Sequence, residues 1–192
     1  MRYLPGFIML LVSTLPARAA DTATVLVAAG GLHDGFFDHS VVLIYEHGAH
    51  SETIGLILNR PMERTLGELS DLKTNHPFYN VPVYRGGPVA PKTLVGLVAS
   101  ENRPDDALEI ADGVYMTLNL GVIEEHWDDL KVSRIQIFLG YAGWAAGQLD
   151  AEVEIESWKF ALVTTDDMFL DDTSGLWEKL HARPPPRMAA MY

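Results

Sequence analysis

The chain has 192 residues, 48% of them hydrophobic, and carries 14 Lys and Arg against 26 Asp and Glu for a formal net charge of −12. This length and composition fit one globular domain and exclude a disordered chain. The negative charge repels nucleic-acid phosphates and anionic lipids, and no run of Lys or Arg offsets it, so we expect no nucleic-acid partner. Cysteine is absent, which excludes disulfides, thiolate catalysis and Cys-based metal sites.

The first nineteen residues have the three parts of an export signal. Arg2 supplies positive charge, an apolar stretch runs from Leu4 to Leu15, and Ala17-Arg18-Ala19 gives the small-x-small pattern that signal peptidase requires. The apolar stretch is shorter than the roughly 20 residues needed to span a bilayer. We therefore expect cleavage between Ala19 and Ala20 and no membrane association afterwards.

The expected organisation is a signal peptide over residues 1–19, one domain over 20–183 and a flexible Pro-rich tail over 184–192. The mature protein is then periplasmic or secreted. The alternative, if the leader is not a signal, is a cytoplasmic protein.

Short apolar, β-branched stretches predict the strands. In chain order these strands cover residues 24–28, 40–45, 53–58, 81–84, 94–98, 108–111, 114–116, 132–139 and 158–164. The second and third are joined by a short polar segment, which predicts a hairpin. Between the sixth and seventh, Asp112-Gly113 predicts a type I′ turn.

Helices are predicted at four places. Thr65 and Glu68 have capping-box spacing, and Leu66, Leu69 and Leu72 then form one apolar helical stripe. The other three helices are predicted over residues 119–130, 145–154 and 176–180. Strands outnumber helices, hairpins mix with crossovers and no internal repeat is present, which indicates a single α+β domain.

Several segments carry a family resemblance across most of the chain. They are Phe37-x-x-Ser40-Val41-Val42 with Glu46-His47, Gly55-Leu56-Ile57-Leu58-Asn59-Arg60-Pro61, Gly86-Gly87-Pro88-Val89, and Gly140-Tyr141-Ala142-Gly143-Trp144-x-x-Gly147-Gln148-Leu149-x-x-Glu152 with Trp158 beyond it. Together they resemble the YqgE/AlgH family of bacterial proteins.

The resemblance implies an α+β fold in which a small closed or bifurcated, mainly antiparallel β-barrel is surrounded by helices. It also brings an old label of transcriptional regulator for some members, and no established activity. Members usually begin directly at the first strand, so the leader departs from the family pattern. An exported protein does not reach the chromosome, which counts against the regulator label.

No arrangement of residues points to catalysis or to a cofactor. A Gly-x-Ser-x-Gly elbow is absent, and Gly86-Gly87-Pro88 lacks the Gly-Lys-Ser/Thr ending of a phosphate loop. The four histidines His33, His39, His47 and His50, with Glu46, are the candidates for a metal site. His47 and His50 fall in a loop where their spacing does not hold both rings on one face, so we expect no metal.

The polar residues inside the family segments are the remaining site candidates: His47, Asn59, Arg60, Arg85, Gln148 and Glu152. One interpretation is structural: Arg60 pairs with Glu152 across the barrel mouth, and Asn59 ties down a turn.

The other interpretation is an anion site. We predict a helix that begins near Trp144 or Ala145 without a capping side chain, so that its first N–H groups are open to a carboxylate or phosphate. Asn59 is the protein acceptor that would otherwise reach those groups. The candidate ligand-binding residues are Asn59, Arg60, Gly140, Gly143, Trp144 and Gln148.

The function expected from the sequence is a non-catalytic binding or adaptor module for a small anionic ligand or a protein partner. The alternatives are an enzyme with an unrecognised polar site and a cytoplasmic regulator.

Overall fold

The structure is a computed structural model that describes residues 22–32, 35–46 and 52–184. The expected signal peptide therefore lies outside the described residues, as do His33, His47, His50 and nearly all of the tail.

Most of the described chain is strand. In chain order the strands are β1 (Thr22–Ala28), β2 (Val41–Glu46), β3 (Thr53–Ile57), β4 (Pro61–Thr65), β5 (Pro82–Arg85), β6 (Val89–Ser100), β7 (Leu108–Ala111), β8 (Val114–Thr117), β9 (Val132–Trp144) and β10 (Trp158–Thr164). The helices are α1 (Leu66–Leu69), α2 (Leu120–Glu125), α3 (Trp127–Leu130), α4 (Gln148–Glu154), α5 (Thr165–Met168) and α6 (Leu176–His181).

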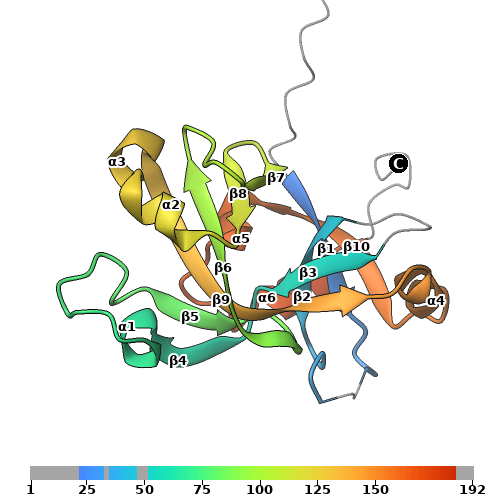
Figure 1. Ribbon diagram of the computed structural model, residues 1–192. Helices are drawn as coiled ribbons and strands as arrows, with labels where there is room; N and C mark the ends of the chain where they lie inside the picture. Colours follow the sequence, from blue (N-terminus) through green and yellow to red (C-terminus); the bar gives the residue numbers. More distant parts are fainter. Residues whose placement is uncertain (1–21, 33–34, 47–51, 185–192) are drawn as a thin grey trace, which may run out of the picture.

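The strands form one curved sheet in the order β10-β1-β2-β3-β9-β6-β8-β7, with a side branch in which β4 pairs with β5 and β5 pairs with β9 (Figure 1). All pairs in the described residues are antiparallel except β5 with β9. The result is a mainly antiparallel β half-barrel with short helices, which confirms the α+β class and the barrel-like sheet.

The long strand β9 holds the two halves of the sheet together. Its first part pairs with β6 and β5, and its last residues pair with β3, where Thr53 lies opposite Trp144. Between these two parts Gly140 has φ +68°, a conformation that side chains disfavour. Strand β9 nevertheless continues through Gly140 without interruption.

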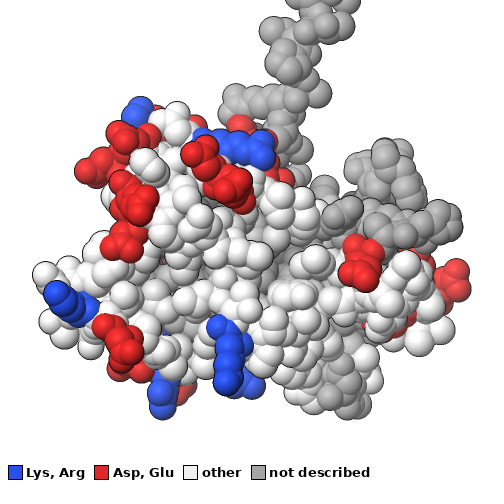
Figure 2. All heavy atoms as spheres, viewed as in Figure 1, with Lys and Arg blue, Asp and Glu red and all other residues white. Residues whose placement is uncertain are grey.

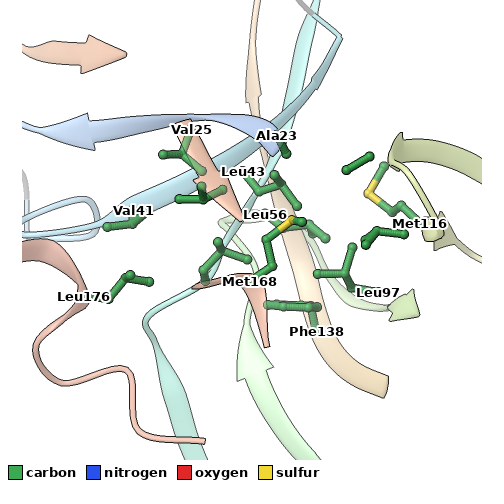
Figure 3. Close-up of a cluster of buried hydrophobic side chains, with 14 of the residues drawn as sticks. Ala23, Val25, Val41, Leu43, Leu56, Leu97, Met116, Phe138, Met168 and Leu176 are labelled. Carbon is green, nitrogen blue, oxygen red and sulfur yellow. The ribbon is translucent and has the colours of Figure 1, made fainter. Parts of the chain in front are cut away.

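The main hydrophobic core fills the inside of the half-barrel (Figure 3). Strand residues such as Leu43, Leu56 and Phe138 are fully buried there. Met168 from α5 and Leu176 from α6 close the same cluster from the helical side. Burying a side chain of this kind contributes about 1.5–3 kcal/mol, so this cluster is the main source of stability.

Two helix predictions need correction. The stripe Leu66, Leu69 and Leu72 is not one helical face, because α1 ends at Leu69 and Ser70 is already extended. Leu66 is buried, whereas Leu69 is 37% exposed. The helix expected from Asn119 is present but breaks at His126 into α2 and α3.

The hairpin between β7 and β8 is confirmed, but its turn is not type I′. A type I′ turn needs positive φ at both central residues. Gly113 has φ +69°, while Asp112 is not among the described residues with positive φ. A bulge between Glu109 and Ala111 supplies the change of register instead.

Candidate functional site

Three motif glycines serve a close backbone crossing. The segment Gly86-Gly87 lies against β9, and a Cβ atom on Gly87 would be 2.0 Å from the carbonyl carbon of Tyr141. A Cβ on Gly86 would be 2.3 Å from the carbonyl oxygen of Gly140, and one on Gly140 would be 2.6 Å from that of Gly87. Real Cβ atoms do not approach backbone so closely, so packing alone requires glycine at these three positions.

Glu152 and Gln148 organise the two tryptophans of the family segments. The Glu152 Oε2 atom accepts hydrogen bonds from the indole N–H of Trp144 at 2.9 Å and of Trp158 at 2.8 Å. The Gln148 Nε2 atom donates to Glu152 Oε1 at 2.9 Å. Both indoles are 4% exposed, so the carboxylate satisfies donors that have little access to water.

Asn59 and Arg60 fasten the segment that precedes β2. The Asn59 Oδ1 atom accepts from the backbone N–H of Val41 at 2.8 Å, and its Nδ2 donates to the carbonyl of His39 at 2.9 Å. The Arg60 guanidinium donates to the carbonyl of Asp38. Asn59 therefore ties down a turn, as the structural interpretation expects, whereas the pairing of Arg60 with Glu152 in that interpretation is wrong.

The start predicted for the uncapped helix, near Trp144 or Ala145, is also wrong, although the N-cap residue of α4, Gly147, makes no side-chain capping hydrogen bond. Strand β9 continues through Gly143 and Trp144, both paired with β3, and α4 begins only at Gln148. The backbone N–H of Ala145 donates to Gln148 Oε1 at 3.1 Å. Strand pairing from β3 reaches beyond Gly140, which the sequence pattern of β9 alone does not reveal.

The candidate ligand-binding residues do not converge on one cavity. Gly140, Gly143 and Trp144 lie along β9, Gln148 lies on α4, and Asn59 and Arg60 follow β3. Arg85, at the end of β5, is exposed and its backbone N–H donates to the carbonyl of Arg60. Their role in ligand binding stays a prediction.

Of the residues considered for metal binding, only His39 has a described side chain. Its Nδ1 lies 2.7 Å from Asp38 Oδ1, and its ring centroid is 4.1 Å from that of Trp177. Within residues 22–32, 35–46 and 52–184 no group of three metal-binding side chains comes together.

A cavity of about 440 Å³ opens at the mouth of the half-barrel. Leu56 from β3, Val95 from β6 and Met116 from β8 are part of its wall, and Tyr141 from β9 completes it. Leu118, at the rim, is 69% exposed. The middle of the face in Figure 2 has few charged groups, while acidic side chains gather over α2 and α3 and near α4.

The polar groups of this mouth cavity are few. They are the Tyr45 and Tyr141 hydroxyls, Thr117, Asn119 and the exposed carboxylate of Asp106. Apolar walls with a small number of polar groups are typical of small-molecule sites, which range from about 300 to 1,000 Å³. Barrel mouths are a common place for them.

The whole fold has known relatives. The model of the AlgH-like family matches residues 25–188. The chain belongs to the AlgH-like family. It is 35% identical over 161 residues to a UPF0301 protein of Parabacteroides distasonis, covering 81% of this chain and 78% of that one. It is 32% identical over 184 residues to a UPF0301 protein of Thermobifida fusca, covering 90% and 91%.

Two solved structures of similar proteins agree with the fold. A crystal structure from Corynebacterium diphtheriae has a TM-score of 0.70, 28% identity and 88% coverage of both chains. The solution structure of the AlgH protein from Pseudomonas aeruginosa has a TM-score of 0.68 and 26% identity, covering 86% of this chain and 88% of that one.

The AlgH-like segments can be recognised in the sequence, whereas the mouth cavity cannot. The motif residues are glycines, tryptophans and their hydrogen-bond partners, all of which stand out in a sequence. The cavity is lined by leucine, valine, methionine and tyrosine, which look the same as core residues. The one available signal was Leu118, an apolar residue placed between a strand and Asn119, which precedes the first residue of a helix.

Proposed function

We propose that this AlgH-like protein is a non-catalytic binding module that holds a small, uncharged apolar or amphipathic molecule in the mouth of the half-barrel. The observation that carries the proposal is the mouth cavity itself, a concave apolar space of about 440 Å³ beside a rim residue that remains exposed. Apolar surface that the fold leaves open gains free energy when a ligand covers it, about 25 cal/mol per Å².

The ligand class differs from the anion expected from the sequence. Asp106 is the charged side chain among the residues that line the cavity, and it is negative. A bound anion would lie near this carboxylate and would lose its hydration against apolar walls. A hydroxyl or carbonyl head group instead finds hydrogen-bond partners in Tyr45, Thr117, Asn119 and Tyr141.

Calorimetric titration with a matched pair of probes tests the proposal. 1-Octanol and octanoate share an eight-carbon body and differ in the charge of the head group. We expect 1-octanol to bind and octanoate to bind at least about fivefold more weakly. Equal affinity for both, or preference for octanoate, contradicts the ligand class.

Matched variants locate the binding. Leu118→Asp places a charge at the rim. Ile155→Asp is the matched control, because Ile155 is 74% exposed at the end of α4 and does not line the cavity. We expect Leu118→Asp to weaken 1-octanol binding about tenfold and Ile155→Asp to leave it unchanged. Loss of binding in both, or in neither, overturns the mouth as the site.

We also propose that the protein is exported. The support is the charged, apolar and small-x-small pattern of residues 1–19, whose removal would change the formal charge from −12 to −14. Among the described residues no helix is long and apolar enough to cross a membrane. Intact mass of the periplasmic fraction should match a chain that begins at Ala20. A full-length species confined to the cytoplasm overturns export and leaves the binding proposal standing.

A further inference from the structure

A second cavity, of about 570 Å³, has the opposite chemistry from the mouth. It lies between the parallel strands β5 and β9 on one side and the segment that follows α5 on the other. Tyr84 and Gln136 reach it from the strands, and Phe169, Leu170 and Asp171 face it from that segment. None of these residues lines the mouth cavity.

Gln136 is a buried amide with an unused acceptor. The residue is 7% exposed, and its Nε2 makes a long hydrogen bond of 3.4 Å to the carbonyl of Leu170. Among the residues that the structure describes, none donates to the Gln136 Oε1 atom. A buried acceptor without a donor is unfavourable, and such atoms usually face a ligand or an ordered water.

The charges around the cavity favour a cation. The Nη1 atom of Arg134 lies 2.7 Å from Asp166 Oδ1, so the one guanidinium among the lining residues is already paired with a carboxylate. Asp171 adds a further carboxylate. Burial and then the nearby Asp171 raise the pKa of Tyr84, and the neighbouring Gln136 amide lowers it by less, so the hydroxyl stays neutral. The lining thus offers acceptors and a net negative charge.

We propose that this cavity binds a small organic cation that carries N–H donors. Its charged head donates hydrogen bonds to the Gln136 amide oxygen and to the Asp171 carboxylate. Both bonds are charge-assisted, which makes them stronger than hydrogen bonds between neutral groups. Its carbon chain packs against Phe169 and Leu170. Tyr84 and Phe169 present aromatic surface, which further favours a cation over a neutral group.

The test uses n-butylguanidinium and n-butylurea, two probes of nearly the same shape that differ in charge. Amide chemical shifts of the wild-type protein report binding. We expect n-butylguanidinium to shift Gln136, Leu170 and Asp171 and to bind at least about fivefold more tightly than n-butylurea. Equal binding of both probes, or no shift at these residues, overturns the proposal and is the result expected if Gln136 only holds a water.

Two variants and one control variant distinguish loss of a ligand contact from loss of the fold. Asp171→Asn, at an exposed position, should weaken n-butylguanidinium about fivefold, while Asp128→Asn on the exposed side of α3 should not. Gln136→Leu should weaken it about tenfold. Unchanged affinity in Asp171→Asn overturns the proposal even if Gln136→Leu does not fold. None of these results bears on 1-octanol at the mouth.

Discussion

The glycine and tryptophan segments and the mouth cavity meet along β9, but their residues differ in how tightly they are packed. In the first region backbone runs against backbone at Gly86, Gly87 and Gly140, and one carboxylate holds two indoles. A side chain added at one of these glycines would collide with backbone atoms. In the mouth, Leu118 is 69% exposed and borders the cavity, whereas Leu56 and Val95 of the cavity wall are buried. The residues easiest to recognise in the sequence therefore hold the fold, while the residues best placed to bind a ligand are ordinary apolar ones.

Gly87→Ala should have the largest effect. The new Cβ would lie 2.0–2.2 Å from three backbone atoms of Tyr141 and Ala142, none of which can move without breaking β9. We expect a loss of more than about 4 kcal/mol in the free energy of unfolding, or no folded protein. Urea unfolding of Gly31→Ala is the control, since nothing lies within 4 Å of its added Cβ. A Gly87→Ala protein as stable as wild type would show that the crossing is not tight.

Glu152→Ala should lower the free energy of unfolding by less than Gly87→Ala does, but still by a measurable amount. It leaves two nearly buried indole N–H groups without their acceptor. Each orphaned donor costs about 1–3 kcal/mol, so we expect a loss of about 2–5 kcal/mol in urea unfolding. Glu154→Ala, exposed on the same helix, is the control and should change stability by less than about 0.5 kcal/mol. Equal effects of the two variants would contradict the structural role of Glu152.

Asp167 is a second buried, hydrogen-bonded carboxylate, and it tests whether such a group stabilises the fold outside the family segments as well. It is 5% exposed, lies outside those segments, and pairs with Lys179 at 2.5 Å. Burial by itself would raise the pKa of the Asp167 carboxyl. Hydrogen bonds from Lys179 and Thr164, with the charges of Lys179 and Arg183, outweigh it and bring the pKa below its ordinary value of 3.8.

A lowered folded-state pKa means that the contribution of Asp167 is present above pH 3.8 and is lost as the pH falls through the folded-state value. We expect Asp167→Asn to cost about 1–2 kcal/mol at pH 7. The difference from wild type should shrink on acidification below pH 3.8, measured by urea unfolding across pH. A difference that stays constant down to pH 2 would show that the ionised form is not the one that stabilises.

Leu118→Asp should have the smallest effect on stability. Its side chain is 69% exposed, so we expect a change within about 0.5 kcal/mol, although 1-octanol binding should weaken about tenfold. A large loss of stability would place Leu118 in the core and remove the contrast between the two regions.

The sequence predicted most of the fold and little of the site. Strand β10 matches its predicted span, because an apolar β-branched stretch bounded by polar residues needs no distant partner to be recognised. Strand β9 runs past its predicted end because Thr53 and Gly55 of β3 pair with it, a contact that local pattern does not contain. The predicted helix start near Trp144 fails for the same reason, because pairing with β3 carries β9 through that residue.

The most direct measurement is an amide chemical-shift map of the protein titrated first with 1-octanol and then with phosphate. We expect 1-octanol to shift the amide signals of Met116, Leu118 and Tyr141 at the mouth. Phosphate should leave those of Gly143 and Trp144 unchanged, because both residues are paired within the sheet. Phosphate shifts at Gly143 and Trp144, with no response of the mouth to 1-octanol, would contradict both expectations.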